Sequence, residues 1–219
     1  MTELQLLLRA VNADLGDPAG WGAPVEFRDS LALCALNAAY SLRSKSATVM
    51  RVLDRYRELR PSAASDSGPD LLEAMDAAGG PEDFARDVLR NVSVLPGTRR
   101  LRTDGIYEGL TRLASPGVAI TKAAQLRAGV VDPAAKKAWL SVSGLGPMSW
   151  SYLLMNAGVD SEVKPDVMVR RYLTRVLTED SSVRPVRARR LLVEAAAQLA
   201  VTPRALDRAI WSYESPSTK

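Results

Sequence analysis

The 219-residue chain has 47% hydrophobic residues, 25% charged residues and a formal net charge of +4, which indicates a globular protein with a substantial core. It contains no histidine and one cysteine, Cys34, so it excludes histidine-based catalysis, an internal disulfide and a four-cysteine iron–sulfur cluster. No apolar run reaches the length of a membrane span and the N-terminus lacks a signal-peptide pattern, so we expect a cytoplasmic protein with no membrane or disulfide-linked partner.

The charges are distributed unevenly along the chain. Residues 61–90 carry seven acidic side chains against two arginines, whereas residues 164–208 carry ten basic side chains against five acidic ones. This asymmetry is typical of a protein with one basic face for a phosphate backbone. Arginine-rich helices that simply face solvent would produce the same pattern.

Hydrophobic periodicity predicts helices along almost the entire chain and gives no credible pair of strands. The first half is predicted to contain helices at residues 3–13, 26–39, 47–59, 71–78 and 82–92. The second half is predicted to contain helices at residues 104–114, 121–128, 133–142 (capped by Asp132), 148–157, 166–177, 186–199 and 203–212. The helix at 26–39 is strongly apolar, so we expect it to be buried.

The most informative pattern lies in residues 140–173, where Gly144-Leu145-Gly146 separates two apolar helical segments. Glycine adopts backbone angles that other residues avoid, so these residues predict a sharp turn. Pro147 suits the first turn of the following helix, a position that needs no N–H donor. Backbone N–H groups at this helix N-terminus can bind a phosphate. An ordinary helical hairpin with a glycine corner would have the same sequence.

A single carboxylate, Asp166, follows twenty residues after Gly146, in the tripeptide Lys164-Pro165-Asp166, and an arginine-rich helix comes directly after it. The glycine turn and this aspartate together resemble the helix-hairpin-helix DNA glycosylase superfamily, the fold of endonuclease III and the alkylpurine glycosylases. The chain resembles a divergent member. The close resemblance covers residues 140–173 and extends loosely over the flanking helices.

The resemblance implies an all-α fold of two helical lobes with a helix-hairpin-helix motif and a cleft between the lobes. One lobe would comprise residues 41–158 and end in the hairpin. The other would join residues 1–40 to residues 159–219. The active site of such proteins lies between the two lobes.

The same resemblance implies binding of duplex DNA and a hydrolytic role in base excision repair, with Asp166 as the catalytic carboxylate. A carboxylate beside the sugar stabilises the positive charge that builds up as the base departs, and it can orient a water. Bifunctional relatives have a nucleophilic lysine where this chain has Met148, so we expect a monofunctional glycosylase without lyase activity. A plain helix-capping role would also account for Asp166.

Further site residues follow from the resemblance by position. The expected DNA contacts are Gly144, Leu145, Gly146, Pro147, Met148, Ser149, Lys164, Arg170 and Arg171. Candidates for a pocket that stacks an extruded base are Trp150, Tyr152 and Tyr40, although a core position is the commoner fate of such aromatic side chains. Family hairpins often bind a monovalent cation, which here would meet the main-chain carbonyls of Leu140, Val142 and Leu145.

A second hypothesis is a non-catalytic member of the same fold that binds a DNA structure or a partner protein. Three departures from the family pattern favour it: Met148 in place of lysine, the lack of iron–sulfur cysteines, and Val167-Met168 where the family commonly has Thr-His. The identity of the excised base and the oligomeric state do not follow from the sequence.

Overall fold

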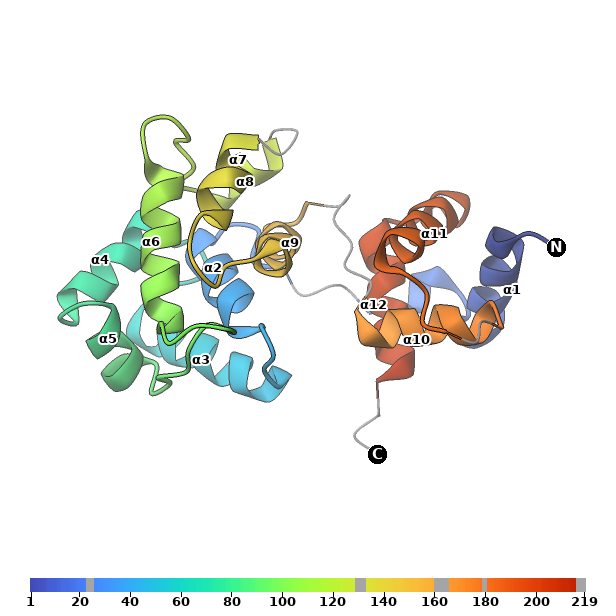
Figure 1. Ribbon diagram of the computed structural model, residues 1–219, viewed down its shortest axis with the longest axis horizontal. Coiled ribbons are helices and arrows are strands. Elements are labelled where there is room, and N and C mark those ends of the chain that lie inside the picture. The colour runs from blue at the N-terminus through green and yellow to red at the C-terminus, as the bar shows by residue number, and fades with distance from the viewer. Residues whose placement is uncertain (23–25, 129–132, 160–165, 179–180, 216–219) are drawn as a thin grey trace. The chain divides into compact units, whose positions relative to one another are not determined.

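The computed structural model describes residues 1–22, 26–128, 133–159, 166–178 and 181–215. These residues form helices joined by loops, and the one β pairing among them is an isolated bridge between Val94 and Leu101. The predicted all-helical fold is therefore confirmed. The chain divides into two compact units, a central unit of residues 26–159 and a terminal unit of residues 1–25 and 160–219 (Figure 1). Within the described ranges, no helix combines the length and apolar character needed to cross a membrane.

The central unit contains most of the helices. In chain order they are α2 (Leu31–Tyr40), α3 (Ser46–Leu59), α4 (Gly68–Ala77), α5 (Pro81–Asp83), the π-helical turn η2 (Phe84–Val88), α6 (Arg102–Ala114), α7 (Ala123–Ala128), α8 (Pro133–Leu140) and α9 (Pro147–Asn156). The terminal unit contains α1 (Glu3–Leu15), the 3-10 turn η1 (Pro18–Gly20), α10 (Val167–Val176), α11 (Pro185–Gln198) and α12 (Pro203–Glu214).

Helix α2 is the centre of the central unit, as its apolar sequence predicted. Every residue of α2 except Asn37 is buried. The helix packs against α3, α4, α6 and α9, which lie around it in Figure 1. Asn37 accepts a hydrogen bond from the side chain of Asn156 on α9 at 2.9 Å, so the one polar position in α2 also contributes to its packing.

The boundaries of the two units differ from the expected lobes. We expected residues 26–40 to join the terminal lobe, but the central unit begins at Glu26 and ends at Val159. The physical reason is the all-round apolar surface of α2, which is buried on every side only when other helices surround it. Its packing against α6 and α9 supplies that environment.

The segment predicted as one helix at residues 82–92 is also different. Helix α5 ends at Asp83, a π-helical turn follows, and the N–H of Leu89 donates to the carbonyl of Phe84 at 2.9 Å. Arg90 then adopts a φ of +46°, which ends helical structure. Residues 91–101 continue as a loop that packs against the α8–α9 connection.

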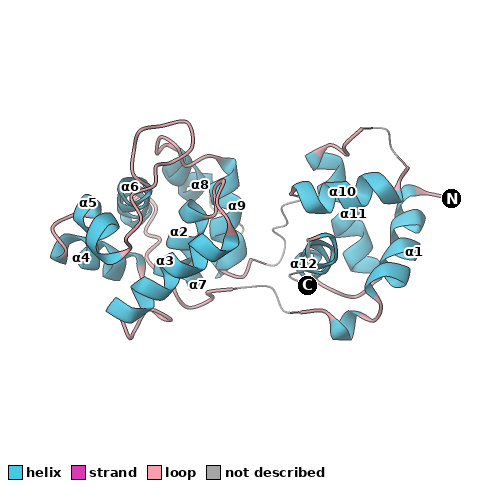
Figure 2. Ribbon diagram, turned by 90° about the horizontal axis from the view of Figure 1, so that it is seen from below, coloured by secondary structure: helices cyan, strands magenta, loops and turns pink. Residues whose placement is uncertain are grey.

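Helices α1, α10, α11 and α12 pack around a second core (Figure 2). The buried residues at the centre of this core are Leu7, Val11, Val169, Tyr172, Leu173, Leu191, Leu192, Leu206 and Ile210. Helix α10 supplies three of them on one face, so its opposite face is available to solvent. This arrangement fixes the position of Asp166, the residue before α10.

A buried carboxylate stabilises the central unit at the end of α3. The side chain of Asp66 is 3% exposed and accepts hydrogen bonds from the Tyr56 hydroxyl at 2.6 Å and from Arg60 Nε at 3.1 Å. Burial alone would raise the pKa of Asp66, but hydrogen bonds from Tyr56, Ser62 and Arg60 and the positive charge of Arg60 lower that pKa below its ordinary value.

We expect Asp66→Asn to lower the free energy of unfolding by about 1–3 kcal/mol near neutral pH, because two donors lose a charged acceptor. The folded-state pKa of Asp66 is depressed, so its contribution is complete above about pH 4 and disappears as the pH falls through the folded-state pKa. Urea denaturation of the wild-type protein and the variant at pH 7 and at pH 3 measures the stability deficit and its dependence on pH. A stability deficit that is the same at both pH values would contradict this account.

Candidate functional site

The connection between α8 and α9 is a tight turn closed by backbone hydrogen bonds. The N–H of Val142 donates to the backbone carbonyl of Trp139 at 3.3 Å, and the N–H of Leu145 donates to the carbonyl of Val142 at 3.0 Å. Gly144 adopts a φ of +90° between these bonds. Helix α9 then begins after Gly146, with Pro147 in its first turn and no side-chain cap on its N-terminus. The backbone therefore makes a tight turn between two helices, as the glycine pattern predicted.

The two glycines of the turn have different roles. A Cβ atom on Gly144 would lie 2.7 Å from Leu95 Cβ and 3.1 Å from Thr98 Cγ2, and its positive φ disfavours other residues in addition. Gly146 has a φ of −87°, and a Cβ there would meet nothing within 4 Å. Glycine is thus required at position 144 by backbone conformation and by close packing, whereas neither reason applies at position 146.

Buried side chains anchor the turn to the rest of the central unit. Val142 and Leu145 are buried, and the Trp139 indole donates to the hydroxyl of Ser149 at 3.0 Å. That hydroxyl donates in turn to the carbonyl of Gly146 at 2.8 Å, and the serine is fully buried. The side chains of Leu145 and Ser149, both expected DNA contacts, therefore face the protein interior, and only their backbone groups could meet a ligand.

Helix α6 supports the turn because it contains two glycines on the facing side. A Cβ on Gly109 would lie 2.8 Å from the Trp139 ring and 3.2 Å from Leu145 Cδ1. Gly105 allows a similarly close approach of Leu95. The absence of side chains at these two positions lets α8 and the turn pack directly on the α6 backbone. Local sequence patterns do not predict this contact, because Gly109 and Trp139 lie about 30 positions apart in the chain.

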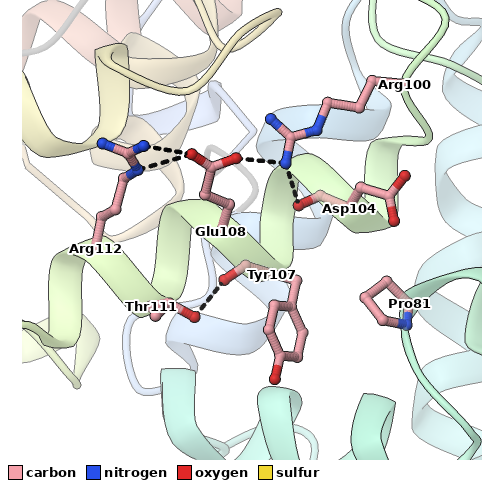
Figure 3. A pocket seen from close by; sticks show the side chains of 7 residues that line it. All are labelled: Pro81, Arg100, Asp104, Tyr107, Glu108, Thr111 and Arg112. Atoms are coloured by element: carbon pink, nitrogen blue, oxygen red, sulfur yellow. Dashed lines mark hydrogen bonds and ion pairs between the residues drawn. The ribbon is translucent and has the colours of Figure 1, made fainter.

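An open groove of about 550 Å³ runs along the exposed side of α6 (Figure 3). Glu108 lies between two guanidinium groups there, paired with Arg112 at 2.6 Å and with Arg100. Burial raises the pKa of Glu108, but hydrogen bonds from both arginines lower it below its ordinary value overall. Arg112 also donates to the hydroxyl of Ser141 at 2.9 Å, which connects α6 to the C-terminal end of α8.

The groove along α6 does not have the character of an anion site. Its charged lining residues are Arg100, Arg112, Asp104 and Glu108, so the charges cancel. Both guanidinium groups are already committed to Glu108. Tyr107, at the same groove, donates its hydroxyl hydrogen to Asp76 at 3.0 Å. These contacts hold helices together and leave no charged group there directed at a ligand.

The exposed part of the turn consists of Ser143, Pro147 and Met148, of which Met148 is 48% exposed. At this end of α9 the N–H groups of Gly146 and Met148 donate to no described residue, whereas Pro147 has no N–H and the Ser149 N–H donates to the Gly146 carbonyl at 3.0 Å. The carbonyl of Val142, one of the three expected cation ligands, accepts the Leu145 N–H and retains a second lone pair. Across the described residues, no group of three histidine, cysteine or acidic side chains is arranged to hold a metal ion.

Asp166 belongs to the terminal unit and caps α10. Its Oδ1 atom accepts hydrogen bonds from the N–H groups of Met168 at 2.8 Å and Val169 at 3.1 Å. The capping role that the sequence suggested as an alternative is therefore confirmed. The other carboxylate oxygen, Oδ2, makes no hydrogen bond to any residue that the structure describes. Lys164, the neighbouring expected DNA contact, lies outside the described residues.

The two arginines expected to contact DNA have different surroundings. Arg170 donates to the carbonyl of Val183 at 2.8 Å and to the hydroxyl of Ser182 at 2.7 Å, so its guanidinium holds the segment before α11. Arg171 is exposed on the other side of α10. Arg170 is partly exposed and its guanidinium is committed to contacts within the terminal unit, whereas Arg171 is exposed. The contact of either residue with DNA stays a prediction.

The aromatic residues expected to stack a base lie mostly in the core. Tyr40 is 1% exposed and donates its hydroxyl to the carbonyl of Asn91 at 3.3 Å, and Trp150 is 3% exposed among core residues of the central unit. Tyr152 is partly exposed and packs on the same core. We therefore assign Tyr40 and Trp150 to the core, because α2 and α9 bury these faces against each other and against neighbouring helices.

Comparison with known proteins gives one match. A family model described as a domain of unknown function (DUF8548) matches residues 5–215. No curated protein and no solved structure matches the chain. The matched range includes helices of both the central and the terminal units, so the family comprises the two-unit chain and not one unit of it. The chain therefore belongs to the DUF8548 family.

Proposed function

We propose that this protein binds duplex DNA through the α8–α9 turn and excises a damaged or mismatched base as a monofunctional glycosylase. The observation that carries the proposal is the turn itself. It joins a left-handed Gly144 to a helix that begins at Gly146-Pro147 without a side-chain cap. The N–H groups of Gly146 and Met148 donate to no described residue, and two such donors at a helix N-terminus favour an anion. A DNA phosphate supplies an anion without sequence preference.

The surroundings of the turn support this proposal. Met148 and Ser143 are exposed at the turn, while Leu145 and Ser149 are buried beneath it, so the backbone is presented on a rigid base. A monovalent cation at the carbonyls of Leu140, Val142 and Leu145 would add positive charge at the same place. The net charge of +4 favours association with a polyanion.

Asp166 supplies the proposed chemistry. Its Oδ1 atom is fixed by two backbone N–H donors, which holds the carboxylate in one orientation, and Oδ2 accepts no hydrogen bond from a described residue. A fixed carboxylate stabilises the oxocarbenium-like sugar that forms as the base departs, and it can accept a proton from the attacking water. Position 148 holds methionine, which cannot form a Schiff base with the sugar, so the product would be an intact strand with an abasic site.

We consider a non-catalytic DNA-binding protein as the second candidate. Capping of α10 accounts for both hydrogen bonds of Asp166 without any catalytic role. The burial of Tyr40 and Trp150 removes two of the three aromatic residues expected to stack a base. Both candidates require DNA binding by the turn, and they differ in whether a base is released.

We expect Met148→Glu to weaken binding of a duplex DNA at least about tenfold at 0.1 M salt, because the new carboxylate repels a phosphate at the turn. An acidic residue in the first turn of a helix is stabilising by about 0.3–1 kcal/mol, so the fold should be retained. Fluorescence anisotropy with a labelled duplex measures the affinity, and a thermal melt verifies folding.

Met50→Glu is the matched control for this experiment. Met50 is 39% exposed on α3 in the same unit, and its substitution makes the same change in charge and shape. We expect less than a twofold change in affinity for the control. If both variants weaken binding equally, the turn has no special role and the proposed interface is wrong.

A further inference from the structure

A second pocket, of about 470 Å³, lies on the solvent-facing side of α10 in the terminal unit. Its lining residues are Val167, Arg171, Thr174, Arg175, Thr178 and Ser182. Apart from Ser182, each lies three or four residues from another of them, so they form one stripe along α10 and its C-terminal end. Ser182 comes from the segment that leads into α11.

The wall of this pocket that contains Ser182 is fixed by Arg170. This side chain donates to the Ser182 hydroxyl and to the Val183 carbonyl, and the Val183 N–H donates to the Thr174 hydroxyl at 3.1 Å. The Val183 side chain is 2% exposed, so it anchors the segment in the core. The position of Ser182 is thus determined by three hydrogen bonds and one buried contact, as in a preformed pocket.

Arg175 forms another wall but is already committed. Its guanidinium pairs with Glu214 at 2.6 Å and with Asp14 at 3.6 Å. It also lies 5.1 Å from the centre of the Tyr172 ring and 5.8 Å from that of Tyr213. Two carboxylates and two aromatic rings fix this side chain, so a ligand in the pocket would not need to order it.

Among the described lining residues, Arg171 is the other charged group, and its surroundings differ from those of Arg170 and Arg175. It makes no ion pair with any described carboxylate and is exposed to solvent. The Ser182 hydroxyl accepts a bond from Arg170 and still has its own hydrogen to donate. A guanidinium and a hydroxyl that converge on one pocket are the donors that recognise the two non-bridging oxygens of a phosphate.

We propose that this pocket binds a backbone phosphate of DNA, with Arg171 and Ser182 as its donors. The inference rests on the proposed DNA binding and adds a contact in the terminal unit to that of the α8–α9 turn. Val167 is 63% exposed at the edge of the pocket and provides an apolar contact for the sugar next to that phosphate. Val167, at the edge of the pocket, directly follows Asp166 in the chain, so the pocket begins at the end of α10 that Asp166 caps.

The test compares Arg171→Gln with Arg9→Gln in the full-length protein. Arg9 is exposed on α1 in the same unit and lines neither pocket, so its substitution removes one charge away from the proposed contact. Affinity for a labelled duplex is measured from 50 to 300 mM NaCl (about one decade of salt in the range where phosphate contacts dominate). One lost phosphate contact should reduce the slope of log Kd against log salt by about 0.9 for Arg171→Gln, and the slope should be unchanged for Arg9→Gln.

Ser182→Ala is an independent test of the same pocket. It removes a neutral donor, so affinity should fall about three- to tenfold while the salt slope stays at the wild-type value. Equal slope changes for Arg171→Gln and Arg9→Gln would overturn the pocket, since they would reflect diffuse charge only. If Arg171→Gln keeps the affinity and the salt slope of the wild-type protein, the pocket is also overturned, and the α8–α9 turn remains as the proposed interface. Absence of DNA binding by the wild-type protein would overturn both proposals.

Discussion

Substitution of Gly144 by alanine is expected to destabilise the central unit by about 2–5 kcal/mol, the largest stability effect expected from a single methyl group in this turn. A φ of +90° costs an alanine about 1–3 kcal/mol. Its Cβ would also lie 2.7 Å from Leu95 Cβ, an atom close to the backbone that cannot rotate away. Relief of that contact requires the loop at residues 91–101 or the turn to move.

Gly146→Ala is the matched control, because it adds the same methyl group two residues away. The φ of Gly146 is −87° and a Cβ at this position meets no atom within 4 Å, so we expect the free energy of unfolding to fall by less than about 1 kcal/mol. Hydrogen exchange resolved by mass spectrometry reports the opening free energy of α6, α8 and α9 separately from the terminal unit. Equal exchange in the two variants would contradict the packing of Leu95 on Gly144.

Asp166→Asn is expected to lower the rate of the proposed base excision by about 10²–10³-fold, because the transition state would lose a preorganised negative charge. Asparagine is as good a helix cap as aspartate, and it can accept the same hydrogen bonds from Met168 and Val169. The stability of the terminal unit should therefore change little. This variant isolates the charge of residue 166 from its structural role.

Asp166→Ala serves as the comparison, because it removes the charge and the cap together. We expect the free energy of unfolding of the terminal unit to fall by about 1 kcal/mol, in addition to the loss of the proposed excision activity. Single-turnover excision assays and thermal melts of both variants separate the two effects. A rate in Asp166→Asn close to that of the wild-type protein would show that the carboxylate is a cap alone and would favour the non-catalytic candidate.

The sequence predicted most helices because their signals are local. Capping residues, helix-breaking glycines and apolar periodicity place α3, α9, α11 and α12 within a few residues of their observed bounds, whereas α2 begins at Leu31 and not at the predicted residue 26. The burial of α2 followed from its composition alone. The helix predicted at residues 82–92 was wrong since its end depends on a π-helical turn and on Arg90 at positive φ, which periodicity does not encode.

The residues of the candidate site were harder to predict, because side-chain contacts between distant segments decide their roles. Arg170 and Arg171 are neighbours in the sequence, yet one holds Val183 and the other is free of described carboxylates. Gly144 and Gly146 look equivalent, but only the former packs against Leu95. The pairs of Glu108 with Arg112 and Arg100 could not be predicted, because i,i+4 charge pairs such as Glu108 and Arg112 are common on solvated helices and Arg100 lies in the loop before α6.

The most direct test of the central claim is incubation of the wild-type protein with duplexes that contain alkylated, deaminated, oxidised or mismatched bases, followed by alkali treatment of half of each sample. The account predicts strand cleavage in one class of duplex only after alkali, because a monofunctional glycosylase leaves an abasic site in an intact strand. No cleavage in any duplex, with DNA binding retained, would contradict the assignment of catalysis to Asp166.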